Sequence, residues 1–256
     1  MRKVTVYIHP TCLASYRLIK HLHSRGLLER VEVVSTANSM QHVLANRVWS
    51  VPWIVVDGEP AATDPVEPLE AEAIITGAWS PTSSKGVEEA FMEAVLHSAY
   101  ASSIAYVHDG LEAVVDPLLV SAAVRAPLRK VMVEDVVDRL RAKSRELWEA
   151  WRDKIMRALG ISFVREYWWA RGGRLEADEL RSSVNTAVIG LWLIAKASLG
   201  RSGLPSNPVP RRELVEKLAR FVLRGAAGLV ARVEREQNTI LADSEYWRLL
   251  GSLGIE

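Results

Sequence analysis

The chain has 256 residues, 49% of them hydrophobic, and a formal net charge of +1 at pH 7. This composition is typical of a folded protein with one or two domains and excludes an intrinsically disordered chain. The balanced charge lacks the basic excess that nucleic-acid binding needs, and no apolar run has the length of a signal peptide or a membrane span. We therefore expect a cytoplasmic protein with neither a nucleic-acid nor a membrane partner.

The cysteine count and the metal-binding residue types set two further expectations. Cys12 is the single cysteine, so the chain holds no internal disulfide. No histidines and carboxylates have the spacing of a metal site, and no metal is expected. Scarce Gln, Asn and Cys favour a thermophilic origin.

Strand and helix patterns alternate over the first 78 residues. In chain order they predict strands at 3–8, 30–34, 51–56 and 60–63, and helices at 12–25, 39–48 and 65–75. Asp57-Gly58 is a strong hairpin signal, and Asp64 with Pro65 is typical of a helix start. The order β-α-β-α-β-β-α predicts an α/β domain with parallel pairing first and an antiparallel hairpin at its end.

The remainder of the chain changes character. Residues 79–86 are polar and rich in turn formers, which indicates a linker. Beyond them the hydrophobic period is helical, with helices predicted near 87–107, 111–125, 131–158, 161–171, 175–199, 211–236 and 243–251. We expect two domains, an α/β domain over 1–78 and a larger all-α bundle over 87–256.

Cys12 lies where a strand gives way to a helix, with Ser15 three residues later. A thiol at a helix N-terminus faces unpaired N–H groups and the positive end of the helix dipole, so its thiolate is stabilised. The Ser15 hydroxyl lies within reach of the sulfur as a hydrogen-bond donor. The alternative is that a lone cysteine serves as a small buried hydrophobe.

Four short motifs then occur in order: Cys12-Leu13-Ala14-Ser15, Val51-Pro52, Asp57-Gly58 and Ala61-Ala62-Thr63-Asp64. With them, the segment 4–75 resembles the glutaredoxin branch of the thioredoxin superfamily and the N-terminal domain of glutathione transferases. An all-α domain after a linker also matches the transferase architecture. The resemblance implies a thioredoxin fold in which Pro52 is cis and packs over the Cys12 sulfur.

The resemblance also implies roles for the remaining residues. Thr11 and the backbone of Val51 would contact a bound thiol, and Thr63 with Asp64 would bind the glutamyl end of glutathione. Glutathione or another low-molecular-weight thiol would be a co-substrate, with no cofactor held permanently. Leu13 replaces the glycine of iron–sulfur-binding relatives, which argues against a cluster. Without a second cysteine, any redox cycle passes through a mixed disulfide resolved by an outside thiol.

Two hypotheses of different classes follow. The first is a thiol-dependent enzyme, either a monothiol oxidoreductase or a transferase-like protein, with Cys12 as nucleophile and a small-molecule or protein thiol or disulfide as substrate. The second is a non-catalytic scaffold whose helical domain binds a protein or a hydrophobic ligand, because one fold hosts both kinds of function. Two-domain proteins of this kind are often homodimers, which is a further expectation.

Overall fold

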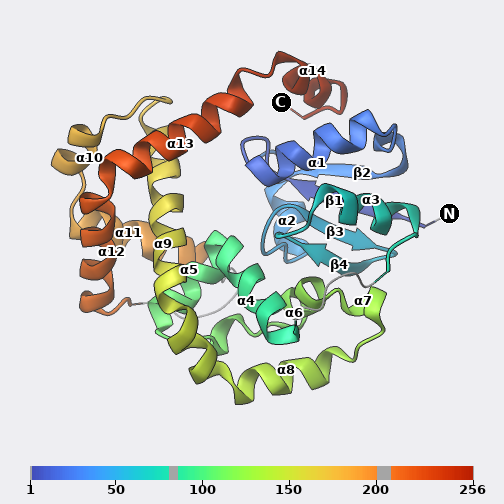
Figure 1. Cartoon of the computed structure of the whole chain (residues 1–256), viewed down its shortest axis with the longest axis horizontal. Coiled ribbons are helices and arrows are strands. Elements are labelled where there is room, and N and C mark those ends of the chain that lie inside the picture. The colour runs from blue at the N-terminus through green and yellow to red at the C-terminus, as the bar shows by residue number, and fades with distance from the viewer. Residues whose placement is uncertain (1, 81–85, 201–208, 256) are drawn as a thin grey trace. The chain divides into compact units, whose positions relative to one another are not determined.

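The computed structural model describes residues 2–80, 86–200 and 209–255 (Figure 1). Residues 81–85 of the predicted linker lie outside the described residues. The chain divides by packing into two compact units. The first comprises 1–97, 115–140 and 240–256, and the second comprises 98–114 and 141–239. This division differs from a single boundary at 79–86, because later helices return to the first unit.

The first unit contains a four-stranded mixed sheet in the order β2-β1-β3-β4. Its strands are β1 (Val4–Ile8), β2 (Glu32–Ser35), β3 (Trp53–Val56) and β4 (Glu59–Thr63). β1 pairs parallel with β2 and antiparallel with β3, and β3 pairs antiparallel with β4. The parallel pair at the start and the hairpin at the end are both as the sequence predicts.

The β3–β4 hairpin turns at Asp57 and Gly58, whose φ angles are 52° and 90°. Two successive positive φ angles are the geometry that an Asp-Gly pair favours in a tight hairpin. The predicted start of the next helix is wrong. Helix α3 (Pro68–Thr76) begins at Pro68 after the N-cap Glu67, not at Pro65 after Asp64. Both prolines suit a first helical position, and the second one occupies it.

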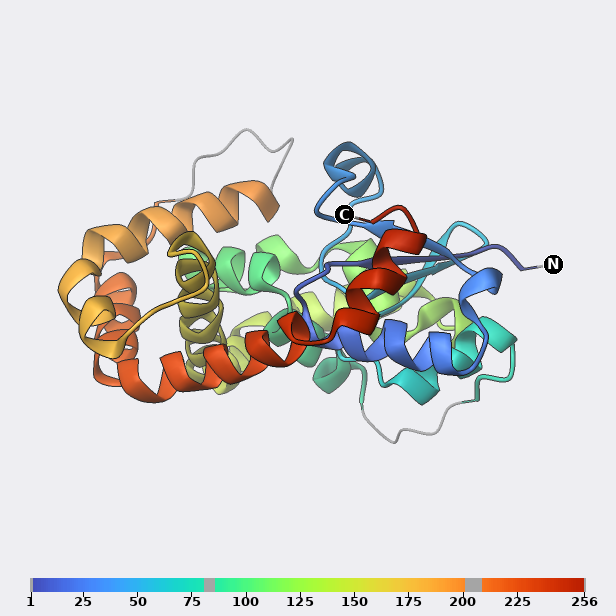
Figure 2. The ribbon, with the colours of Figure 1, turned by 90° about the horizontal axis from the view of Figure 1, so that it is seen from above.

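Helices cover both faces of the sheet. α1 (Leu13–Ser24), α3 and the C-terminal α14 (Ser244–Ser252) share one core with the side chains of β1 and β3 that point to their face. This core holds Val4, Val6, Ile8, Leu18, Ile19, Leu22, Ile54, Val56, Ile74, Tyr246 and Leu250. α14 lies beside α1 in two perpendicular views (Figures 1 and 2). On the other face, His42 of α2 (Met40–Ala45) stacks on Tyr7 at 5.6 Å between ring centroids.

Further helices complete the first unit: α4 (Val87–His97), α6 (Pro117–Val124), α7 (Ala126–Arg129) and most of α8 (Val133–Ala142). α6 packs on β4, where the Ser121 hydroxyl donates to the Pro60 carbonyl at 3.1 Å. Arg125, buried between α6 and α7, donates two hydrogen bonds to Glu70 of α3 and one to the Pro65 carbonyl. The buried guanidinium therefore ties α6 to the segment that leads into α3.

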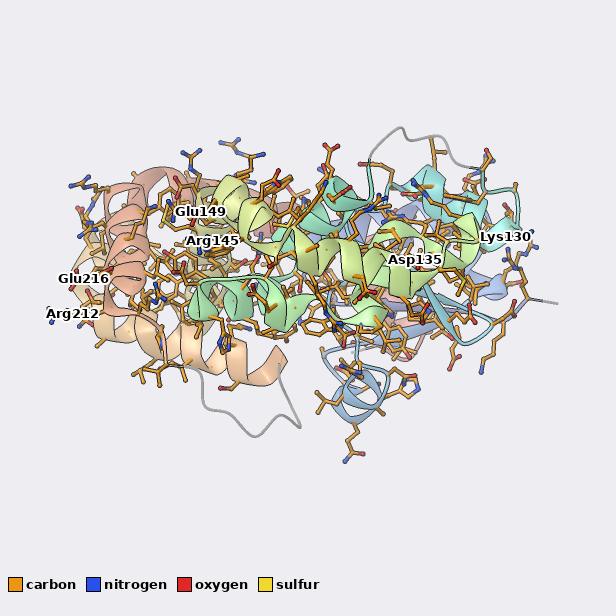
Figure 3. The ribbon with its side chains drawn as sticks, turned by 90° about the horizontal axis from the view of Figure 1, so that it is seen from below. Lys130, Asp135, Arg145, Glu149, Arg212 and Glu216 are labelled. Carbon is orange, nitrogen blue, oxygen red and sulfur yellow. The ribbon has the colours of Figure 1, made fainter. Side chains whose placement is uncertain are left out.

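The described residues of the second unit form helices joined by turns and loops, with no strand among them. It contains α5 (Ala99–His108), α9 (Ser144–Ala170), α10 (Ala177–Ser183), α11 (Thr186–Gly200), α12 (Arg212–Arg224) and most of α13 (Ala226–Leu241). Gly160 of α9 lies against the Phe221 ring of α12, and a Cβ there would come within 2.6 Å of it. On the surface of α12, Arg212 and Glu216 form an ion pair at 2.7 Å (Figure 3).

Candidate thiol site

A tight turn between β1 and α1 presents Cys12. The Cys12 N–H donates to the His9 carbonyl at 3.0 Å, and the Tyr16 N–H donates to the Cys12 carbonyl at 2.8 Å. Cys12 is the N-cap of α1, with extended backbone angles. The Ser15 hydroxyl, fully buried, accepts a hydrogen bond from the His9 N–H at 3.2 Å. The turn therefore fixes the thiol at the end of the helix where N–H groups are unpaired.

The Cys12 sulfur contacts the segment that leads into β3. Its thiol donates to the Val51 carbonyl, with 3.6 Å between Sγ and O. The Val51–Pro52 peptide bond is cis and Pro52 is buried. The contact places the Val51 carbonyl beside the Cys12 sulfur. Residues 39 positions apart in the sequence are thereby brought together.

Burial raises the pKa of the Cys12 thiol above its ordinary value. Hydrogen bonds from the N–H groups of Ser15 and Ala14 and from the Ser15 hydroxyl lower the pKa, while the Asp64 carboxylate raises it. The net direction is opposite to the one expected from the helix N-terminus alone. Desolvation disfavours the thiolate more strongly than the hydrogen bonds favour it.

The other predicted residues divide between the surroundings of the site and the protein interior. The Thr11 hydroxyl lies 3.1 Å from Nδ1 of His9, on the turn itself. Thr63 is fully buried, and its hydroxyl has no hydrogen-bond partner within the described residues. Asp64 lies near enough to act on Cys12, and its carboxylate accepts a hydrogen bond from Nδ1 of His97 at 2.9 Å. A ligand ammonium group at Asp64 would thus share the carboxylate with an imidazole.

Sequence reasoning missed Tyr246 as part of this site. Its side chain is fully buried, and its hydroxyl donates to the Pro10 carbonyl at 2.9 Å, two residues before Cys12. The predicted helix near 243–251 contains Tyr246, but Tyr246 lies 236 positions after Pro10 in the sequence. No periodicity or motif connects positions so far apart.

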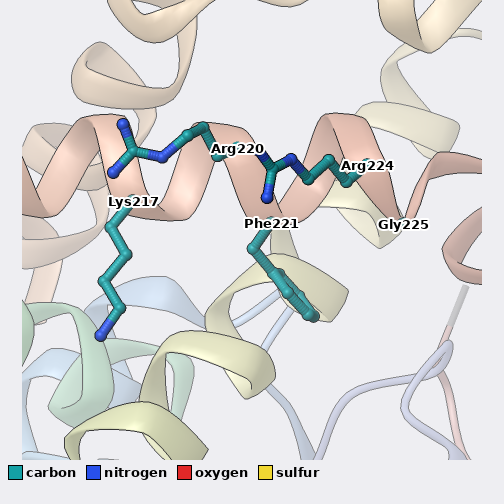
Figure 4. A pocket seen from close by; sticks show the side chains of 5 residues that line it. All are labelled: Lys217, Arg220, Phe221, Arg224 and Gly225. Carbon is teal, nitrogen blue, oxygen red and sulfur yellow. The ribbon is translucent and has the colours of Figure 1, made fainter.

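Elsewhere the structure offers little that binds a ligand or a metal. An open hollow of about 470 Å³ on α12 is lined by Lys217, Arg220, Phe221, Arg224 and Gly225 (Figure 4). The lining combines three cationic side chains with the Phe221 ring, and Lys217 also pairs with Asp153 at 2.6 Å. Among the described residues, no group of three His, Cys or acidic side chains could hold a metal ion. None of the described helices combines the length and apolarity needed to cross a bilayer.

No protein-family model, no curated protein and no solved structure matches this chain.

Proposed function

We propose that the protein is a monothiol, thioredoxin-like thiol–disulfide oxidoreductase with Cys12 as its nucleophile. One observation carries the proposal: the Cys12 sulfur lies at the N-terminus of α1 and 3.6 Å from the carbonyl of Val51, the residue before the cis-Pro52. A thiol in this position has the N–H groups of the helix on one side. On the other side lies the Val51 backbone, which can pair with the chain of an incoming substrate. The strand order β2-β1-β3-β4 supports the thioredoxin-like assignment of the sheet.

The chemistry is an exchange with an external disulfide, R–S–S–R′. The Cys12 thiolate attacks one sulfur, so that a Cys12–S–S–R bond forms and R′–S⁻ leaves and takes a proton from water. A second, outside thiolate then attacks the substrate sulfur of the mixed disulfide. This step releases the substrate as a new disulfide and regenerates the Cys12 thiolate. Each step breaks one S–S bond and forms one, so no cofactor is consumed.

The residues around Cys12 have distinct tasks in this proposal. The N–H groups of Ala14 and Ser15, with the Ser15 hydroxyl, stabilise the thiolate during attack and when it leaves. The backbone of Val51 aligns the incoming chain of the substrate. Thr11, on the turn between β1 and α1, would contact the bound thiol. Asp64 would bind an ammonium group on a low-molecular-weight thiol such as glutathione. Thr63, the other residue that the resemblance places at the glutamyl end, is fully buried in β4.

A second candidate function is a non-catalytic thioredoxin-like scaffold. It is favoured by the direction of the Cys12 pKa, because a raised pKa lowers the fraction of thiolate, which is the nucleophile. In that case a partner would bind through the helical part. The hollow on α12, with three cationic side chains beside the Phe221 ring, is the candidate contact surface for such a partner.

An exchange assay separates the two functions. The wild-type chain and Cys12→Ser are each incubated with hydroxyethyl disulfide and glutathione, and glutathione mixed disulfide formation is followed. Oxidoreductase function predicts turnover by the wild type and none by Cys12→Ser. The assay is repeated with coenzyme A and with cysteine as the outside thiol. If both proteins give only the rate measured without protein in every case, the result would instead support the scaffold.

A further inference from the structure

The C-terminal segment belongs to the packing of the thiol site. Ile240, Tyr246, Leu250 and Ile255 lie in the same core as β1 and α1. The N-cap of α14, Asp243, accepts hydrogen bonds from the Tyr16 hydroxyl at 2.8 Å and the Lys20 ammonium at 2.9 Å. α14 is thus fastened along α1, the helix whose N-terminus carries Cys12.

Within this contact, Tyr246 reaches the turn before Cys12. Its hydroxyl donates to the carbonyl of Pro10, a buried residue that has no N–H of its own to anchor the turn. A buried carbonyl without a partner is unfavourable, and Tyr246 supplies the hydrogen bond that the structure gives this one. The phenol therefore holds the backbone directly upstream of the thiol.

The same side chain also contacts the first turn of α1 after Cys12. The ring of Tyr246 packs edge-on against the ring of Tyr16, with 4.9 Å between centroids and 79° between planes. Tyr16 in turn donates its N–H to the Cys12 carbonyl. One fully buried tyrosine thereby contacts the chain on both sides of Cys12.

We propose that Tyr246 is a positioning residue for Cys12, whose hydroxyl fixes the turn that aligns the sulfur with the N–H groups of Ala14 and Ser15. The inference rests on the proposed function, in which Cys12 reacts as a thiolate. It gives the C-terminal helix a role in tuning the thiol and not only in stability. The Asp64 carboxylate, in the β4–α3 segment, is the charged group that acts on the Cys12 sulfur, and a substitution at Tyr246 leaves it in place.

The test compares two matched substitutions in the full chain. Tyr246→Phe removes the hydroxyl that bonds Pro10, and Tyr16→Phe removes the hydroxyl that bonds Asp243; both keep their rings. Protein labelled with ¹³Cβ-cysteine gives a single signal, because Cys12 is the only cysteine, and its shift is titrated with pH. Urea denaturation of each variant is measured in parallel.

We expect Tyr246→Phe to lower the thiolate fraction about three- to tenfold at a given pH below the midpoint, the equivalent of losing one ordinary hydrogen bond. Tyr16→Phe should stay within about twofold of the wild type even if it loses similar stability. Equal titrations for both variants would make Tyr246 merely structural and overturn the proposal. So would a wild-type thiol that does not ionise below about pH 11, since the turn would then not stabilise a thiolate at all.

The readout also separates this inference from the function on which it rests. The carbon shift reports ionisation whether or not Cys12 reacts with any disulfide. A Tyr246-dependent midpoint in a protein without exchange activity would retain the positioning role and refute the oxidoreductase. Exchange activity with equal titrations would do the reverse.

Discussion

Replacing Asp243 by Asn tests how α14 is held on α1. The Asp243 carboxylate accepts the N–H of Tyr246 at 2.9 Å as an N-cap and also accepts the Lys20 ammonium and the Tyr16 hydroxyl. Its side chain is only 17% exposed. Asn keeps an oxygen for the cap but removes the charge and one acceptor, so the substitution isolates the electrostatic part of the contact.

The structure gives the magnitude of this effect. The Tyr246 N–H, with Lys20 and Tyr16, lowers the pKa of Asp243 from 3.8 to about 2. A carboxylate whose pKa is lower in the folded state contributes stability above its unfolded pKa and loses that stability as the pH falls through the folded one. The shift corresponds to about 2 kcal/mol at pH 6, about 1 kcal/mol at pH 3 and less than that at pH 2.

Urea denaturation of the wild type and Asp243→Asn at pH 6, 4 and 3 measures this difference. We expect the wild type to be more stable by about 2 kcal/mol at pH 6, with the gap narrowing by about half at pH 3. Lys20→Met serves as a control background, because it removes one partner of the Asp243 carboxylate. In this background the stability difference between Asp243 and Asn should be smaller but should still narrow as the pH falls. A difference between the two chains that is constant from pH 6 to 3 would refute the assigned role of the charge.

Two further predictions concern packing and the thiol. Gly160→Ala should destabilise the chain by about 1–2 kcal/mol, because the new Cβ meets the Phe221 ring. In a Phe221→Ala background the same change should stabilise it by up to about 1 kcal/mol through helix propensity; urea denaturation that gives the same sign in both backgrounds would contradict the contact. Ser15→Ala should raise the pKa of Cys12, since the hydroxyl lowers it, and the pH dependence of iodoacetamide labelling measures the shift; an unmoved midpoint would remove Ser15 from the site.

Local sequence signals predicted the strands and the hairpin of the first unit. Alternating β-branched residues and the Asp57-Gly58 turn act over a few positions, so the strands and the hairpin follow from them directly. The start of α3 needed more, because Pro65 and Pro68 are both acceptable first residues. Asp64 was the expected N-cap for a start at Pro65. Its carboxylate bonds His97 instead of capping the helix, and the helix starts at Pro68.

The thiol site was predicted only in part, for physical reasons. Cys12 and Pro52 stand out by position, but the direction of the Cys12 pKa depends on burial, which sequence spacing does not report. Tyr246 and Arg125 act on segments far away in the chain, and neither lies in a motif. The division of the chain into units also escaped detection, because residues 115–140 and 240–256 return to the sheet after helices of the second unit.

The most direct measurement of the central claim is mixed-disulfide formation on the native chain. The folded protein is incubated with hydroxyethyl disulfide, quenched with acid, and its intact mass is followed over time, before and after addition of a low-molecular-weight thiol. A reactive Cys12 predicts a single adduct on the folded chain that the added thiol removes. An adduct that forms only once urea unfolds the protein would contradict the account and make Cys12 part of the core.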